Sequence, residues 1–143
     1  RQDRKQGQAE PQGKPAFRHG MSYRLAITAN GLLFAGLFVV LCFAPTVYLT
    51  GYGVPVNDSA TFITRRAAPM FLGLAFMMWA IRNQTPSPAR RAITDGTALL
   101  LLGIAATGLY ALATGAVGPK ILVGVAVELP FAAALLASRN TAP

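Results

Sequence analysis

Residues 120–138 read KILVGVAVELPFAAALLAS, an apolar run that carries one carboxylate, Glu128, near its middle. About twenty consecutive apolar residues suffice to cross the hydrocarbon core of a bilayer as a helix. A charged side chain at mid-membrane costs at least about 2.5 kcal/mol on insertion. Glu128 is therefore expected to face the interior of a helix bundle, where it is either protonated or beside a partner.

Three more apolar stretches precede this one, and together they predict four membrane-spanning helices. The predicted spans cover about residues 25–44, 63–82, 89–113 and 120–138. The uninterrupted apolar part of the second span, 67–81, is short, so its helix is expected to carry Arg65 and Arg66 into the membrane edge. Short connections between spans favour antiparallel neighbours. The predicted fold is all-α, a four-transmembrane-helix antiparallel bundle over residues 24–139.

Local signals predict where some of these helices begin. Residues 46–59 are rich in Gly, Pro and Asn and are expected to form a loop. Asp58 and Ser59 are candidate N-caps for the second span. Ser87 followed by Pro88 is typical of an N-cap and a first helical residue, and predicts the start of the third span.

Charge places the chain in a membrane and orients it. Only 13% of the residues are charged, against roughly 25% in soluble domains. The chain has thirteen Lys and Arg residues, and nearly all of those outside the N-terminal segment lie at span ends rather than along one face, which argues against nucleic-acid binding. They concentrate on the side shared by both termini. Together with heavy Ala and Arg use, this predicts a bacterial inner (plasma) membrane protein with cytoplasmic termini.

Residues 1–23 are predicted to be a disordered, basic N-terminal tail, because they combine low hydrophobicity with Gln, Pro and Gly. The tail either sets the topology alone or also contacts anionic headgroups, each cation contributing ~1 kcal/mol near the surface. Met21 lies just before the first span and is a candidate natural start. Arg91 and Asp95, four residues apart, share a helical face and are expected to pair.

A candidate polar site inside the membrane is predicted from five side chains. They are Glu128, Tyr110, Thr107, Asn30 and Arg66. Thr107 and Tyr110 share one face of the third span, and their hydroxyls are expected to point toward Glu128. Asn30 is expected to form a hydrogen bond between helices, and Arg66 lies close enough in depth for a stretched pair with Glu128. Small residues at similar depth leave room for a cavity there.

The sequence offers little support for a disulfide, a metal site, a haem or an enzyme active site. One cysteine, Cys42, allows no internal disulfide, and one histidine, His19, allows no His-based metal site or bis-His haem within this chain. No nucleotide motif or catalytic dyad is present. No catalytic residue, metal or cofactor is therefore predicted, and an enzyme is not favoured, although quinone or lipid binding between spans stays open.

Several residues of the second half carry a resemblance. They are Arg66 with Gly73, Gly108-Leu109-Tyr110 followed by Gly115, and Glu128-Leu129. In this pattern residues 60–138 resemble a family of small four-span bacterial inner-membrane proteins of unknown function. In that family a basic residue often follows the span-three glycine, where this chain has Leu109. The resemblance implies an architecture rather than an activity.

The sequence predicts an integral membrane protein that acts as a non-catalytic helical module, an accessory or assembly subunit of a membrane complex. Its expected partners are the lipid bilayer and other membrane subunits or further copies of itself. The alternative is a small transporter or proton-coupled carrier that uses Glu128 as its titrating group. A third interpretation of Glu128 is purely structural, a hydrogen bond that locks the helices together.

Overall fold

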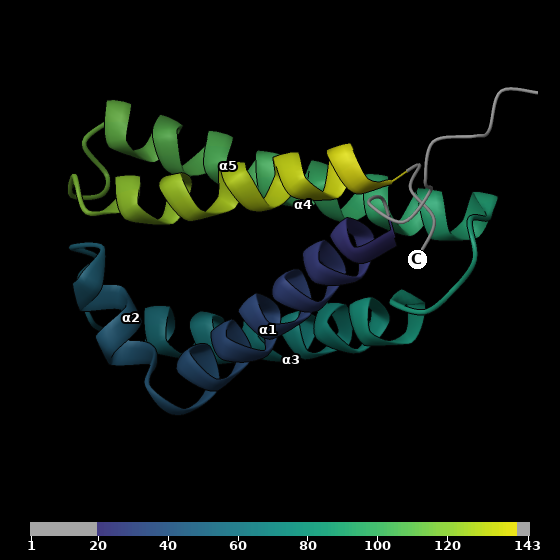
Figure 1. Ribbon diagram of the computed structural model, residues 1–143. Coiled ribbons are helices and arrows are strands. Elements are labelled where there is room, and N and C mark those ends of the chain that lie inside the picture. Colours follow the sequence, from purple (N-terminus) through teal and green to yellow (C-terminus); the bar gives the residue numbers. More distant parts are fainter. Residues whose placement is uncertain (1–19, 140–143) are drawn as a thin grey trace, which may run out of the picture.

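The computed structural model describes residues 20–139, with side chains from Tyr23 onward. Within that range the chain forms five helices and no strand, which confirms the all-α prediction (Figure 1). The helices are α1 (Gly20–Phe43), α2 (Pro45–Gly51), α3 (Asp58–Ile81), α4 (Pro88–Ala113) and α5 (Ile121–Ser138). The predicted tail lies outside the described residues except for 20–23. Those four belong to α1, so the helix begins earlier than predicted.

Three of these helices are long and apolar enough to cross a membrane, and they are compatible with an integral, multi-pass membrane protein. They are Tyr23–Phe43 of α1, Pro88–Ala113 and Ile121–Ser138. The fourth predicted span, 63–82, does not meet the same standard. Its helix, α3, has 24 residues, as many as α1. It falls short in composition because Arg65 and Arg66 lie within it.

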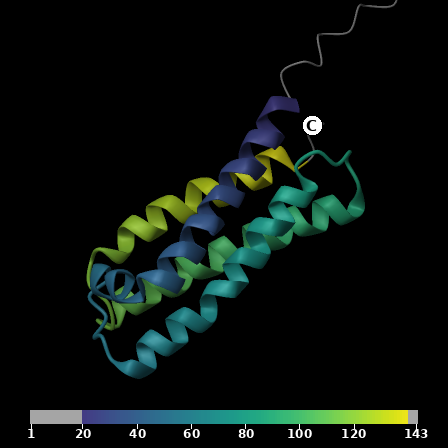
Figure 2. The same ribbon diagram turned by 90° about the horizontal axis from the view of Figure 1, so that it is seen from below.

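The long helices form two antiparallel pairs, α1 with α3 and α4 with α5 (Figure 1). The pairs meet mainly through α1 and α5, whereas α3 and α4 barely touch. In Figure 1 the ribbons approach each other where α1 begins and α5 ends, and they separate toward α2. Figure 2 shows α1 crossing over the other helices in the view from below. We refer to the end where α1 begins and α5 ends as the closed end, and to the end at α2 as the open end.

The largest buried cluster lies toward the closed end. It includes Tyr23, Ile27 and Phe34 of α1, Met78 and Ile81 of α3, Ala98 and Leu101 of α4, and Ala132 and Leu135 of α5. The Tyr23 hydroxyl donates a 3.4 Å hydrogen bond to the Ile81 carbonyl. All four long helices thus contribute to one core, which holds the two pairs together there.

Arg90 is part of this closed end, although a guanidinium is costly to bury without partners. Its side chain is 2% exposed. The guanidinium carbon lies 3.5 Å from the centroid of the Tyr23 ring, and Nη1 donates a 2.8 Å hydrogen bond to the Gln84 carbonyl. Arg90 therefore joins the start of α4 to α1 and to the α3–α4 connection, in addition to adding charge at a helix end.

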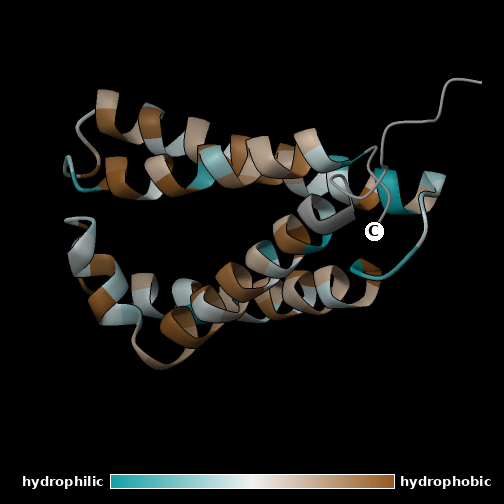
Figure 3. Ribbon diagram, in the orientation of Figure 1, coloured by the Kyte–Doolittle hydropathy of each residue, from teal (hydrophilic) through white to brown (hydrophobic). Residues whose placement is uncertain are grey.

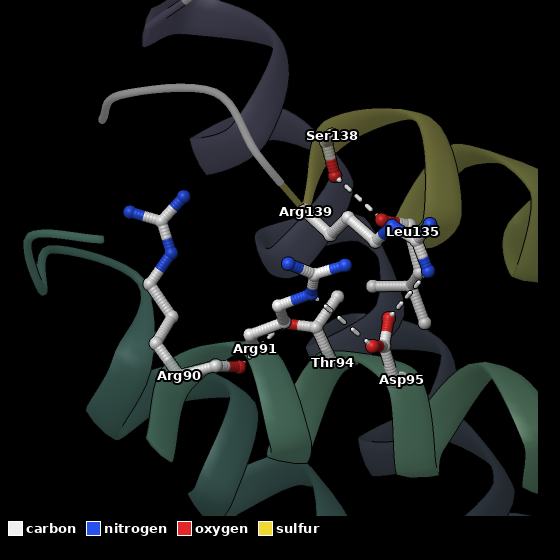
Figure 4. Close-up of polar contacts among 7 residues, drawn as sticks. All are labelled: Arg90, Arg91, Thr94, Asp95, Leu135, Ser138 and Arg139. Atoms are coloured by element: carbon white, nitrogen blue, oxygen red, sulfur yellow. Dashed lines mark hydrogen bonds and ion pairs between the residues drawn. The ribbon is translucent and has the colours of Figure 1, made fainter. Parts of the chain in front are cut away.

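The predicted ion pair between Arg91 and Asp95 is present, with 3.7 Å between Arg91 Nε and Asp95 Oδ2. Asp95 also accepts a hydrogen bond from Arg139, 3.2 Å from Nη1 to Oδ1, so it ties the end of α5 to α4 (Figure 4). This second pair joins residues 44 positions apart and is a tertiary contact. Figure 3 shows hydrophilic residues gathered at this end and apolar residues along the helices.

The segment predicted as a loop, 46–59, begins with the short helix α2, so that prediction is wrong in its first half. Pro45 occupies the first turn, where its fixed φ favours a helix and its missing N–H costs nothing. The Thr50 hydroxyl donates a 2.9 Å hydrogen bond to the Thr46 carbonyl. The helix ends at Gly51 with Tyr52 as its C-cap, and the next residue, Gly53, has a φ of 73°, the left-handed conformation common after helices.

The caps of the next two helices follow the predicted residue types. Asn57 caps α3, one residue before the predicted Asp58, and its Oδ1 accepts from the Ala60 N–H at 2.8 Å. Ser87 caps α4 as predicted, since its Oγ accepts from the Arg90 N–H at 3.2 Å. Both satisfy a backbone donor that the helix itself leaves unpaired.

Candidate functional site

A cavity of about 190 Å³ lies between the helix pairs and receives side chains from all five helical segments. Its apolar lining consists of Leu33 and Leu37 of α1, Phe71 of α3, Leu101 and Ile104 of α4, and Val123, Gly124 and Val127 of α5. Its titratable lining residues are Glu128 of α5 together with Tyr48 and Tyr52 around α2. The cavity is thus an apolar chamber with one carboxyl group and two phenols.

Glu128 is half-buried in the first half of α5, one helical turn after Gly124. A Cβ atom built on Gly124 would lie 3.2 Å from Tyr52 Oη and 3.8 Å from Glu128 Oε1. The missing side chain therefore lets the Tyr52 hydroxyl approach the backbone of α5 beside the carboxylate. No hydrogen bond or ion pair joins Glu128 to any residue in the range 20–139. Its oxygens are available to a proton or a ligand.

Tyr48 and Tyr52 are four residues apart, on α2 and at its C-cap, and their rings pack edge to face. The ring centroids are 4.9 Å apart with an interplanar angle of 80°. Burial raises the pKa of Tyr48 to about 12, and the neighbouring Tyr52 and Glu128 add to the effect. Burial and the Glu128 carboxylate also raise the pKa of Tyr52. Both phenols therefore stay neutral at physiological pH and act as hydrogen-bond donors and aromatic surfaces.

A backbone contact holds α2 over the cavity. The Gly118 N–H, in the turn between α4 and α5, donates a 3.0 Å hydrogen bond to the Tyr52 carbonyl. Glycine is favoured at Gly53, because its φ of 73° lies in the left-handed region and a Cβ there would lie 3.4 Å from the Gly118 nitrogen. This hydrogen bond bridges the two helix pairs at the open end of the molecule.

A second hollow, of about 310 Å³, lies on the other side of the tyrosine pair. It is lined by Val47, Tyr48, Gly51, Tyr52, Lys120 and Val123. The two hollows share Tyr48, Tyr52 and Val123, so these side chains form the partition between them. Movement of the tyrosine rings would join the Glu128 cavity to the outer hollow.

The hydroxyl partners predicted for Glu128 on α4 lie elsewhere. Tyr110 is 72% exposed, and Thr107 is exposed and donates its hydroxyl to the Ile104 carbonyl at 2.8 Å. The inward face of α4 instead carries Ile104 and Gly108, and a Cβ on Gly108 would lie 3.2 Å from Ile121. This close packing against α5 sets the rotation of α4 and turns the predicted hydroxyls outward.

The two remaining predicted residues also lie outside the cavity. Asn30 is fully buried, but its Nδ2 donates to the Ala26 carbonyl of its own helix at 2.9 Å. It lines a separate apolar groove between α1 and α5. Arg66 is exposed on α3, and among the described residues it forms no ion pair with Glu128. Of the five predicted site residues, only Glu128 lines the cavity.

Tyr48 and Tyr52 are site residues that the sequence did not predict. They lie in the segment 46–59, which was expected to form a loop. Their spacing of four, three residues after Pro45, is the signal for a helical turn with both rings on one face.

The described residues contain no group of three or more His, Cys, Asp and Glu side chains placed to hold a metal ion. The chain matches no protein-family model, no curated protein and no solved structure. The likeness to four-span bacterial proteins therefore stays an expectation.

Proposed function

We propose that this chain is an integral protein of the bacterial inner membrane in which all four long helices cross the bilayer and both termini are cytoplasmic. The length of α3 supports its crossing, since 24 residues span roughly 36 Å at about 1.5 Å per residue. Its arginines, Arg65 and Arg66, lie in the half nearer α2, from which long side chains reach an interface. At the opposite end lie Arg82, Arg90, Arg91 and Arg139.

Of the two roles that the sequence leaves open, the geometry favours a small proton-coupled carrier with Glu128 as its titrating group. The observation that carries this proposal is the cavity between the two helix pairs, which contact each other less than the helices within each pair do. The cavity holds the Glu128 carboxylate, which has no hydrogen-bonding or ionic partner among residues 20–139. Carboxylates inside membranes mark ion and substrate pathways. Rocking of one pair against the other offers a way to expose the cavity to alternate sides.

The carrier is tested in proteoliposomes on a solid-supported membrane, with an imposed pH gradient and a panel of solutes. We expect at least one solute to give a transport current that Glu128→Gln abolishes. Asp95→Asn is the matched control, because Asp95 is a carboxylate on a spanning helix that pairs with arginines at the polar end, outside the cavity. A current that survives in Glu128→Gln contradicts the proposal.

The second candidate is a non-catalytic accessory or assembly subunit of a membrane complex. It is supported by the large apolar side chains on the outer face of α4, where Leu99 is 71% exposed and Tyr110 is 72% exposed. Such a face contacts lipid, another membrane subunit or a second copy of the chain. Native mass spectrometry after mild detergent extraction separates these cases. Defined partners support the subunit, whereas a monomer or homo-oligomer favours the carrier.

A further inference from the structure

We propose that the cavity beside Glu128 binds a small organic cation, a positively charged nitrogen carried on a compact apolar body. This inference deepens the proposed carrier by naming its ligand class, and it rests on that function for any transport of the ligand. The charge, the aromatic surface and the size of the cavity support it.

The charge of the site favours a cation. Glu128 has no hydrogen-bonding or ionic partner among residues 20–139, and the cavity residues from α1, α3 and α4 are all apolar. A charged nitrogen supplies the counter-charge that the helices do not. An anion would meet a like charge, and a neutral hydrocarbon would leave a polar group buried without a partner.

The aromatic lining favours an organic cation over a metal ion. Aromatic faces attract cations within about 6 Å of the ring centroid. Tyr48, Tyr52 and Phe71 bring three rings to a cavity whose remaining walls are aliphatic. Hard metal ions such as Ca²⁺ require about 6–8 oxygen ligands, far more than one carboxylate and two phenols supply.

The size of the cavity limits the ligand. Its volume of about 190 Å³ is below the roughly 300–1,000 Å³ of pockets that hold drug-sized molecules. It is close to the roughly 150 Å³ of an apolar cavity that accommodates benzene. An aryl-methylammonium or a small tetraalkylammonium ion therefore matches both the room and the chemistry.

Among the described residues, the cations on the outer side are Arg65, Arg66 and Lys120. Lys120 lines the outer hollow beyond Tyr48 and Tyr52, eight residues from Glu128 and thus ~12 Å away along α5 at about 1.5 Å per residue. Lys120 is therefore too far from Glu128 for an ion pair, which requires about 4 Å between nitrogen and oxygen. Binding of the ligand and protonation of Glu128 exclude one another, because both neutralise the same carboxylate. The cation enters as the proton leaves to water, which supplies the coupling that a carrier needs.

The test is calorimetric titration of the purified full chain in detergent with benzylammonium chloride. We expect saturable binding that weakens as the pH falls and Glu128 becomes protonated. Neutral benzyl alcohol, which has a similar shape, is expected to bind at least about tenfold more weakly, and Glu128→Gln to reduce benzylammonium affinity by a similar factor. Glu128→Asp retains the charge and is expected to restore much of the binding.

Two further variants test the aromatic and steric parts of the site. Tyr52→Leu is expected to weaken binding several-fold, whereas Tyr110→Leu, on the outer face of α4, leaves it unchanged. Gly124→Ala keeps the carboxylate but places a methyl group 3.2 Å from Tyr52 Oη, and it is expected to weaken binding. Helical content and a monodisperse elution profile establish that each variant is folded.

The outcomes separate this inference from the carrier. Equal affinity for benzyl alcohol, unchanged binding by Glu128→Gln, or no binding of either benzylammonium or tetramethylammonium overturns the inference. Glu128-dependent currents with other solutes would then leave the carrier standing. Conversely, Glu128-dependent binding of benzylammonium without any transport current upholds the ligand class and contradicts the carrier.

Discussion

Two charged residues, Arg90 and Glu128, occupy opposite situations within the same bundle. Arg90 is buried at the closed end, where it stacks on Tyr23 and donates to the Gln84 carbonyl. Glu128 is half-buried at the open end and has no described partner. A buried charge with partners stabilises the fold, whereas one without partners disfavours its own ionised form. We therefore infer that Arg90 stabilises the fold, whereas Glu128 is the residue that binds a proton or a ligand.

Replacing Arg90 by Lys is expected to lower the free energy of unfolding by about 1–3 kcal/mol, because lysine loses the planar stack on Tyr23 and the directed hydrogen bond. The adjacent Arg91→Lys is the control. Its side chain is 55% exposed, so its effect should stay within about 0.5 kcal/mol. Unfolding by SDS in mixed micelles, followed by circular dichroism, measures both. Equal effects would show that the burial of Arg90 contributes nothing.

The raised pKa of Tyr48, about 12 against 10.0 for an exposed phenol, predicts a loss of stability at alkaline pH. Below pH 10 the phenol is neutral in both the folded and unfolded chain, so Tyr48 adds no pH dependence. Between pH 10 and 12 the unfolded chain ionises first, and the free energy of unfolding falls. Tyr48→Phe should flatten this decline. A profile of equal slope in both proteins, measured by SDS unfolding, would rule out burial of Tyr48.

At the scale of elements, two glycine-terminated turns shape the open end. Gly53 follows α2 and Gly115 follows α4, each with a φ of 73°. After α4, the Ala116 N–H donates to the Ala111 carbonyl at 2.9 Å and the Gly115 N–H to Leu112 at 3.1 Å, the Schellman pattern. These turns deliver the Gly118 N–H to the Tyr52 carbonyl, and so position the tyrosines at the cavity.

Gly115→Ala is expected to destabilise the protein by about 1–2 kcal/mol, because a Cβ disfavours the left-handed conformation. Gly36→Ala serves as its control, since Gly36 is helical and has no atom within 4 Å of the added Cβ. That change should stabilise the helix by up to about 1 kcal/mol. Thermal unfolding of the two variants in detergent should shift in opposite directions. A stabilising effect of Gly115→Ala would contradict the turn.

At the scale of the whole molecule, the two helix pairs differ in how they are joined. A core cluster, Arg90 and the Asp95–Arg139 pair hold the closed end. The open end has the Gly118–Tyr52 hydrogen bond and the cavity. An unequal distribution of contacts concentrates any relative motion of the pairs at the weaker end. This asymmetry is why we place ligand entry beside α2.

Cysteine accessibility tests the crossing of α3, in a Cys42→Ser background with a membrane-impermeant maleimide applied to intact cells. Ala116→Cys and Asn83→Cys flank α4 and should react on opposite sides, with residue 116 outside. We expect Val56→Cys to react from outside like residue 116, because α3 separates residues 56 and 83. Labelling of Val56→Cys in the same pattern as Asn83→Cys would mean that α3 does not cross.

The helical architecture was predictable to within a few residues because long apolar runs, their caps and their charged ends are local properties of the chain. The Ser87 cap and the Arg91–Asp95 pair are confirmed for that reason. The short helix α2 was missed because Gly, Pro and Asn in the segment are typical of a loop. The helix over the predicted span 63–82 is not among the three that meet the length and composition of a membrane span, because two arginines lie within it, so its crossing of the bilayer stays a prediction.

The sequence by itself determined that the chain is helical, that it contains helices suited to a bilayer and which polar residue lies within the last of them. Only the tertiary structure decided what surrounds that residue. In an apolar helix the inward and outward faces are chemically alike, so hydropathy does not set its rotation. Close packing does, as where Gly108 meets Ile121, and it turns Thr107 and Tyr110 outward while Tyr48 and Tyr52 line the cavity of Glu128.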